Sequence, residues 1–259
     1  AYYSGAGNRF VIVQEKDIEK YLKKMNFSAL KEWATSLSDG SQGVVADGLV
    51  VVKAHPEYHF EWEFFNNDGS LAQMCGNAAR CVCQFAWDQK ITSSKEIRFL
   101  TNRGEVRGSY EGSGRVRVSL ATPSQKQDPR LPSETRWVES GVPHCVVEAS
   151  EWPPEKERAM QYRQIEAFQI EGVNVTFFRS KSQYQVEAMT FERGVDGFTM
   201  ACGTGAIAAA FVKSDCVLTD RTVEVQMPGG LLEVQFYKQS DHVDLIGPVQ
   251  HFFEWSISE

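Results

Sequence analysis

The sequence predicts a mixed α and β protein of two similar β-rich halves, each wrapped around a buried helix. Three observations lead to this prediction. Short segments rich in β-branched and aromatic residues recur along the 259 residues, and amphipathic helical patterns are few. Two further segments, 78–86 and 206–212, are apolar nearly all round. A helix without a polar face must be covered on every side, which sheets curling around it would do.

The predicted strands are short, often alternate in polarity, and are separated by turn signals such as the Asn-Asp-Gly-Ser run at 67–70. In order they are 10–13, 49–52, 59–65, 116–120, 145–148, 173–178, 184–190, 222–226, 231–237, 243–246 and 252–255.

Helical periodicity outside the two apolar segments occurs in two places. Ser28 is predicted to cap a helix in which Leu30, Trp33, Ala34 and Leu37 share one face. A second helix is predicted over 154–168, opened by a proline. The polar stretch 121–129, with two prolines, predicts a boundary near the middle of the chain.

A cysteine precedes each apolar segment, in the sequences CGNAAR at 75–80 and CGTGAI at 202–207. A thiol at the first turn of a buried helix lies beside backbone N–H groups that favour an anion. Two such helix ends facing each other would hold one carboxylate between two thiols. This equipment could move a proton from one face of a carbon to the other. The alternative is that both Cys-Gly pairs are simply tight helix entries.

Composition excludes several classes of partner and site. The net charge of −7 argues against nucleic acid or an anionic membrane as a main partner, and no apolar run is long enough to span a membrane. The first residues lack a secretory pattern, so we expect a cytoplasmic protein. The six cysteines have no zinc or redox spacing. We therefore interpret Cys81, Cys83, Cys145 and Cys216 as small buried hydrophobes.

The motifs resemble those of the diaminopimelate epimerases, which interconvert LL- and meso-diaminopimelate without a cofactor. Six motifs occur in the family's order, nearly from end to end: GAGNRF at 5–10, FNNDGS at 65–70, CGNAARC at 75–81, GVPHC at 141–145, VNV at 173–175, and ERG at 192–194 followed by ACGTG at 201–205.

The resemblance implies two β-barrel-like α/β domains, related by a pseudo-twofold axis, with the active site between them. The first domain would comprise 1–118 with a C-terminal strand at about 250–259, and the second 119–249. The resemblance further implies that the protein is a homodimer and acts in lysine and peptidoglycan-precursor biosynthesis. The substrate would be an amino acid, with no cofactor or metal.

The residues implied in catalysis are two thiols acting as thiolate base and thiol acid, and two neighbours that set their protonation. These are Cys75, Cys202, His144 and Glu192. The residues implied in substrate binding are helix N-terminal amides and polar side chains: Asn8, Asn66, Gly76, Asn77, Asn174, Arg193, Gly203 and Thr204. Considered without the resemblance, His144 after a proline would more often be a structural histidine.

The sequence departs from the family pattern mainly where the substrate is recognised. Val142 replaces an asparagine, Arg9 stands where aspartate is usual, Gly48 takes a place that some members fill with glutamine, and Ala78 replaces glycine. The alternatives are therefore a racemase of another amino acid on the same fold and an amino-acid-binding homologue without turnover. Thiol–disulfide chemistry of Cys75 and Cys202 is a third.

Overall fold

The structure is a computed structural model that describes the chain except residues 23–26, 38–39, 41–42, 73, 171 and 255–259. It has the predicted mixed α and β fold, in two compact units. The first comprises 1–118 and 248–259, and the second 119–247. The last residue of the strand predicted at 252–255, and the second half of the C-terminal strand predicted at about 250–259, lie outside the described residues.

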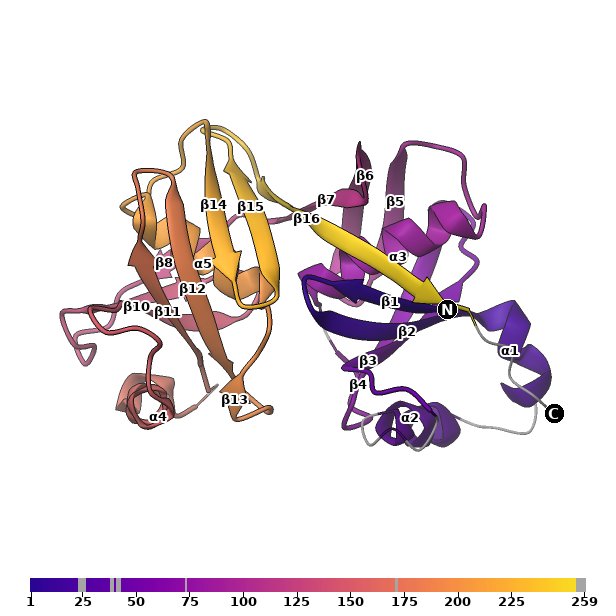
Figure 1. Cartoon of the computed structure of the whole chain (residues 1–259), viewed down its shortest axis with the longest axis horizontal. Helices are drawn as coiled ribbons and strands as arrows, with labels where there is room; N and C mark the ends of the chain where they lie inside the picture. The colour runs from indigo at the N-terminus through magenta and orange to yellow at the C-terminus, as the bar shows by residue number, and fades with distance from the viewer. Residues whose placement is uncertain (23–26, 38–39, 41–42, 73, 171, 255–259) are drawn as a thin grey trace. The chain divides into compact units, whose positions relative to one another are not determined.

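The first unit is a closed barrel around one helix, α3 (Gly76–Asp88). Each strand pairs with the next along the barrel, and the last pairs with the first. In order they are β1 (Tyr2–Gly5), β2 (Asn8–Gln14), β3 (Gly48–Lys53), β4 (Phe60–Asn66), β5 (Glu96–Thr101), β6 (Gly104–Gly112), β7 (Arg115–Ala121) and β16 (His242–Phe253). Two outer helices, α1 (Glu15–Leu22) and α2 (Phe27–Ser36), connect β2 to β3 (Figure 1).

The second unit surrounds α5 (Gly203–Lys213) with strands of the same kind (Figure 1). Its strands are β8 (Ser124–Lys126), β9 (Thr135–Glu139), β10 (Pro143–Glu148), β11 (Asn174–Ser180), β12 (Gln185–Glu192), β13 (Gly197–Phe198), β14 (Arg221–Met227), β15 (Gly230–Phe236) and the first part of β16. The helix α4 (Lys156–Arg163) and the 3₁₀ turn η1 (Glu166–Phe168) connect β10 to β11.

The two units share one pattern of strand pairing. In the first, β2–β3 and β4–β5 are parallel, whereas β3–β4 and β5–β6 are antiparallel. In the second, β10–β11 and β12–β14 are parallel, whereas β11–β12 and β14–β15 are antiparallel. The central helix follows β4 in one unit, and in the other it follows β12 and the short β13. The predicted internal repeat is therefore present in the topology.

The strand register relates individual positions of the two repeats. Phe10 pairs with Gly48 where β2 meets β3, and His144 pairs with Asn174 where β10 meets β11. One residue further along β3 and β11, the antiparallel partners are Phe65 and Phe191. The residues after these phenylalanines, Asn66 and Glu192, therefore correspond. Asn8 and Val142 correspond in the same way, two residues before Phe10 and His144.

The two central helices have almost no polar face, and the surrounding strands bury them on every side. Every residue from Gly203 to Phe211 of α5 is buried. In α3 all residues from Gly76 to Ala86 except Gln84 are buried, including Arg80. Cβ atoms would not fit where two strand glycines approach α3. A Cβ on Gly108 would lie 2.4 Å from Cys83 Sγ, and one on Gly5 would lie 2.8 Å from the Asn77 carbonyl oxygen.

Two helix predictions need correction. The helix predicted over 154–168 is two separate elements, since α4 ends at Arg163 and the 3₁₀ turn η1 follows it. The break lets η1 bury Phe168 against Trp137. The helix predicted to be capped by Ser28 begins one residue earlier, at Phe27. Leu30, Ala34 and Leu37 are buried in the first unit's core, with Trp33 packed against them, as predicted.

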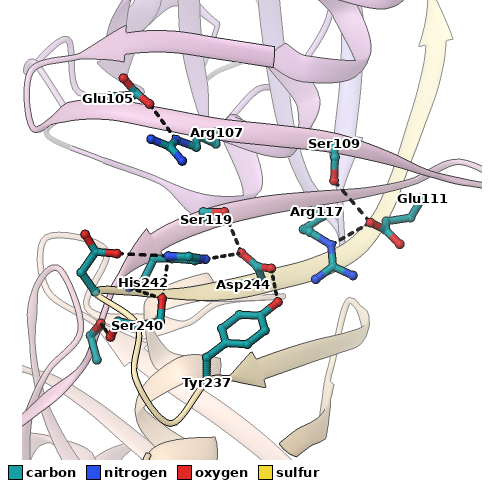
Figure 2. Close-up of polar contacts among 12 residues, drawn as sticks. Glu105, Arg107, Ser109, Glu111, Arg117, Ser119, Tyr237, Ser240, His242 and Asp244 are labelled. Carbon is teal, nitrogen blue, oxygen red and sulfur yellow. Dashed lines mark hydrogen bonds and ion pairs between the residues drawn. The ribbon is translucent and has the colours of Figure 1, made fainter. Parts of the chain in front are cut away.

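The strands β7 and β16 both run from one unit into the other. On the second unit's part of these strands, the buried carboxylate of Asp244 accepts hydrogen bonds from Ser119 Oγ (2.7 Å) and Tyr237 Oη (2.6 Å). The ring of His242 lies 4.0 Å from the same carboxylate (Figure 2). One buried acid on β16 thus connects three segments: β7, β16 and the residue that follows β15.

Candidate active site

The helix α5 begins directly after a buried cysteine. Cys202 is the N-cap, in an extended backbone conformation, and its Sγ accepts a hydrogen bond from the Gly205 N–H at 3.4 Å. The first intrahelical bond runs from Ala206 N–H to the Cys202 carbonyl oxygen. Helix geometry leaves the N–H groups of Gly203 and Thr204 without a partner inside the helix. A thiol and amide dipoles therefore lie at one buried helix end.

A chain of polar side chains leads away from Cys202 into the core of the second unit. Thr204 Oγ1 lies 3.3 Å from Cys202 Sγ and 3.0 Å from His144 Nε2. On its other side His144 Nδ1 lies 2.9 Å from Thr176 Oγ1, which lies 2.9 Å from Thr190 Oγ1. His144 and both of these threonines are fully buried. The histidine thus reaches the thiol through Thr204.

Burial decides the charge of His144. Desolvation, with a smaller contribution from the positive charge of Arg193, lowers the pKa of His144 from 6.5 to about 3. A neutral imidazole has one donor and one acceptor nitrogen, which suits a neighbour hydroxyl on each side. His144 is therefore a neutral hydrogen-bonding group in this site at physiological pH.

The remaining residues expected in the second unit lie around the ends of β11 and β12. Asn174 is buried, and its Oδ1 accepts a hydrogen bond from the backbone N–H of Arg193 at 2.8 Å. Glu192 Oε1 accepts one from Thr199 Oγ1 at 2.5 Å. The Arg193 side chain is exposed and passes close to Gly172, where a Cβ would lie 2.9 Å from Arg193 Cδ. Asn174 thus orders the turn that carries Arg193.

The helix α3 begins in the same way, with Cys75 as its N-cap in an extended conformation. Cys75 is half-buried, and its side chain makes no capping hydrogen bond. The Ala79 N–H bonds to the Cys75 carbonyl oxygen, so helix geometry leaves the N–H groups of Gly76 and Asn77 without an intrahelical partner. The predicted thiol at the first turn of a buried helix is confirmed in both halves.

The polar residues expected in the first unit form two separate local networks. Asn77 Nδ2 donates to Asn8 Oδ1 at 2.6 Å, which joins α3 to the start of β2. Asn66, at the end of β4, donates to Ser70 Oγ at 3.0 Å within the following turn. Asn8 and Asn77 are therefore brought together, whereas the side-chain hydrogen bond of Asn66 to Ser70 stabilises its own turn.

Several residues of these networks were missed by the sequence analysis. Thr176 and Thr190 gave no signal, because alternating threonines are ordinary in strands. Ser140, whose Oγ donates to the Thr204 carbonyl oxygen at 2.9 Å, lies in an unremarkable turn. Arg80 did carry a signal, since it is a lone charge in an apolar helix.

The six cysteines all lie among the described residues, and none forms a disulfide bond. Cys81, Cys83 and Cys145 are buried as predicted, and burial raises the pKa of each thiol, that of Cys145 to about 12. Cys216 differs, because it lies beyond the end of α5 with a φ of 57° and is only half-buried. The interpretation of Cys216 as a buried hydrophobe was wrong.

Two cavities lie at the opposite ends of the central helices from the thiols. One, of about 800 Å³, includes Gln89, Lys90 and Ile91 just after α3, and the other, of about 520 Å³, includes Val212 and Cys216 at the end of α5. Neither is lined by a candidate site residue. In the described part of the chain, no three His, Cys, Asp or Glu side chains cluster as metal ligands would. No helix there has the length and apolar character needed to span a membrane.

Comparisons with a family model, with relatives of known name and with solved structures all find proteins similar to this chain over nearly its whole length. The family model for diaminopimelate epimerase matches residues 1–125 and 136–252. The diaminopimelate epimerase of Aquifex aeolicus is 35% identical over 98% of this chain and 96% of its own length. That of Hydrogenobaculum is 34% identical over 99% of this chain and 97% of its own. Among solved structures, a Bacillus anthracis protein of the PhzF phenazine-biosynthesis family covers 100% of this chain and 97% of its own, with a TM-score of 0.73 and 11% identity.

Proposed function

Because the chain belongs to the diaminopimelate epimerase family, we propose that it interconverts LL- and meso-diaminopimelate with two thiols as its acid and base. The observation that carries the proposal is the repeated helix start. Cys75 and Cys202 are the N-caps of the two central helices, at equivalent places in a duplicated topology. Binding alone would need neither thiol.

The proposed reaction removes the proton from one face of the substrate's α-carbon and adds a proton to the opposite face. A thiolate takes the α-proton, so that an S–H bond forms as the C–H bond breaks. The electron pair left behind is delocalised onto the α-carboxylate. The opposing thiol then donates its proton to the other face of the carbon and becomes the thiolate. The two sulfurs exchange protonation states in each turnover, and no metal or cofactor takes part in these steps.

The main chemical difficulty is the weak acidity of an amino acid's α-carbon. Amide N–H groups at the helix starts are suited to stabilise the negative charge that develops on the carboxylate, as in an oxyanion hole. We assign this role to the backbone of Gly76 and Asn77 in one unit and of Gly203 and Thr204 in the other. Removal of one such donor typically raises a barrier by about 2.7–4 kcal/mol. The helix termini also favour the thiolate form of a capping cysteine.

The neighbouring side chains have distinct proposed roles. His144, neutral and linked to Cys202 through Thr204, would orient the hydroxyl beside the thiol. Glu192 would help to set the protonation of the thiols. Asn8, Asn66, Asn174 and Arg193 would hold the polar groups of the substrate, with the guanidinium able to grip a carboxylate by two hydrogen bonds.

A racemase of another amino acid remains the second candidate, because Val142 cannot offer the hydrogen bond of the asparagine that it replaces. The position is half-buried, and its carbonyl oxygen accepts from Ser140 N–H at 3.2 Å. Its apolar side chain alters the chemistry available for recognition without altering the thiols.

One experiment separates the two candidates. The reduced protein is incubated in deuterated water with LL-diaminopimelate and a panel of single amino acids, and deuterium at the α-carbon is followed by mass spectrometry. We expect exchange and inversion with diaminopimelate, and a loss of at least about 10²-fold in C75A and C202A. Exchange with another amino acid but not with diaminopimelate would move the assignment to the second candidate. Binding without any exchange would indicate a non-catalytic homologue.

The family relationship also suggests the cellular setting. We propose that the protein acts as a cytoplasmic homodimer in lysine and peptidoglycan-precursor biosynthesis. Light scattering of the purified protein, which should give twice the mass of the chain, tests the dimer directly.

A further inference from the structure

The guanidinium of Arg80 is a buried charge without an acidic partner in the described part of the chain. The residue is 0% exposed, inside the barrel of the first unit. Its Nη1 donates to the Gly76 carbonyl oxygen at 3.3 Å and its Nη2 to Asn77 Oδ1 at 2.8 Å, while Nε has no partner among the described residues. A buried charge is costly unless an opposite charge compensates it. The position therefore favours an anion nearby.

The contacts of Arg80 show where that anion would be. Its side chain folds back along α3 to the first residue of the helix, Gly76, which follows Cys75 directly. Arg80 interacts electrostatically with Cys81 and Cys75. Burial lowers the pKa of Arg80 to about 10, so the guanidinium keeps its charge at neutral pH. A permanent positive charge thus lies at the first turn of α3, the helix that the half-buried Cys75 caps.

Arg80 also determines how two amides point. Because Asn77 Oδ1 accepts from Arg80, Asn77 Nδ2 faces Asn8 and donates to Asn8 Oδ1 at 2.6 Å. The Asn8 Nδ2 group then faces Asp47 Oδ2 at 3.4 Å. An amide has one acceptor end and one donor end, so the fixed donor at Arg80 sets both orientations.

The other repeat lacks this cation. The residue at the equivalent place, five after the cysteine, is the buried and apolar Ile207. There the thiol neighbour is Thr204, backed by the neutral His144. The two repeats therefore differ at this equivalent place, which holds a cation in the first and an apolar side chain in the second.

We propose that Arg80 is a positioning residue of the first thiol site, whose charge favours the thiolate of Cys75 and whose hydrogen bonds fix the amides of Asn77 and Asn8. The proposal deepens the proposed function and rests on it only for the catalytic meaning of that thiolate. In the resting enzyme, Cys75 would then be the base and Cys202 the thiol acid.

Other titratable groups around α3 do not provide the same charge. Cys81 is buried and its pKa is raised, mainly by desolvation, so it stays a neutral thiol at physiological pH. Asp47 reaches the site only through Asn8, and Tyr3 pairs with Asp88 at the far end of the helix. From pH 6 to 9, Arg80 is therefore the cation among the described residues that is buried in α3 and keeps its charge.

The test measures thiol reactivity in the free enzyme. Wild type, R80M and R80Q are alkylated with iodoacetamide across a pH series, and the modified Cys75 and Cys202 peptides are quantified separately by mass spectrometry. We expect the pH midpoint of Cys75 alkylation to rise by about one unit or more in both neutral variants, because a nearby opposite charge typically shifts a pKa by about one to three units. Cys202 should not change.

Matched variants separate charge from packing. R80K keeps the charge but not the planar pair of donors, so its Cys75 midpoint should stay near that of wild type while the KM for diaminopimelate rises. I207M changes the equivalent place in the other repeat and should leave both midpoints unchanged. If R80M does not give a cooperative thermal transition, R80Q, which retains a donor amide, carries the test.

An unchanged Cys75 midpoint in a folded neutral variant would overturn the proposal. Alkylation requires no substrate, so the outcome is independent of the proposed function. If the Cys75 midpoint shifts but the protein exchanges no amino acid, the proposed role of Arg80 stands and the proposed epimerase activity fails. If the protein exchanges diaminopimelate but the midpoint does not shift, the epimerase activity stands and the role of Arg80 fails.

Discussion

The starts of α3 and α5 have the same backbone design but are supported by different side chains. Each has a cysteine N-cap followed by glycine and a buried helix. Behind Cys75 lies the charged chain of Arg80, Asn77 and Asn8, whereas behind Cys202 lies a neutral chain that begins with Thr204 and His144.

This difference indicates that the duplicated fold conserves the placement of thiol and amide dipoles but not the means of supporting them. Backbone N–H groups come with any helix start, so both copies have them. The supporting side chains have to fill whatever space the surrounding strands leave. In the first unit that space holds a long guanidinium, and in the second it holds a ring and three hydroxyl groups.

The comparison is tested most strongly at the third residue after each cysteine, Ala78 in one helix and Gly205 in the other. A Cβ on Gly205 would lie 2.2 Å from Thr190 Oγ1 and 3.1 Å from Thr176 Oγ1, so it would push into the hydroxyl chain. We expect G205A to lower the free energy of unfolding by about 1–3 kcal/mol. The matched change A78G should cost only about 1 kcal/mol, the usual helix preference for alanine.

Urea denaturation of both variants measures the difference. G205A should also reduce turnover, since Thr190 and Thr176 support His144, whereas A78G should leave turnover close to wild type. Equal losses of stability would mean that the two helix starts are equally tolerant and that the hydroxyl chain is not tightly packed.

The sequence predicted the parts of this arrangement that depend on local pattern. The all-apolar stretches indicated the central helices, and the cysteines before them indicated the two helix starts, because both signals lie within a few neighbouring residues. The alternating strands such as β4 were found for the same reason.

The parts that depend on distant contacts were not predictable in this way. β5 and β6 contain several charged residues on their exposed side, so their apolar alternation is weak, and neither was predicted. The two partners of His144 come from two different elements, β11 and α5, and Thr176 and Thr190 meet only after β11 and β12 pair in register. Arg80 needed the barrel around α3 to be recognised as a buried charge.

A second prediction uses pH to distinguish the two groups of supporting side chains, that of His144 behind Cys202 and that of Arg80 behind Cys75. The pKa of His144 is lowered to about 3 in the folded protein, by burial first, so the unfolded chain binds a proton below about pH 6.5 that the folded protein does not. Lowering the pH from 6.5 toward 5 should therefore destabilise the protein, by up to about 1.4 kcal/mol per pH unit.

Urea midpoints measured across this range in wild type and H144Q check the prediction. H144Q should remove that part of the slope. R80Q should keep it, because the pKa of Arg80 is about 10 and its charge does not change there. A slope that is the same in wild type and H144Q would show that His144 is not buried in its neutral form.

The smallest expected effect concerns substrate recognition, where Asn8, the first residue of β2, and Val142, directly before β10, occupy equivalent positions. Asn8 accepts a hydrogen bond from Asn77, and Val142 has no polar side-chain atom. V142N would restore the amide implied by the family pattern. One added hydrogen bond contributes about 0.5–1.5 kcal/mol, so KM for diaminopimelate should fall by roughly 2- to 10-fold.

The reciprocal change N8V provides the control. It leaves the buried Asn77 amide without its acceptor, so KM should rise, by about 1–3 kcal/mol in equivalent free energy. Steady-state kinetics with LL-diaminopimelate compare both variants with wild type. If V142N weakened diaminopimelate binding and N8V did not, the distal end of the substrate would have to be recognised differently from the family pattern. The valine would then mark an altered substrate, because an apolar contact at that place would favour a side chain without a polar terminus.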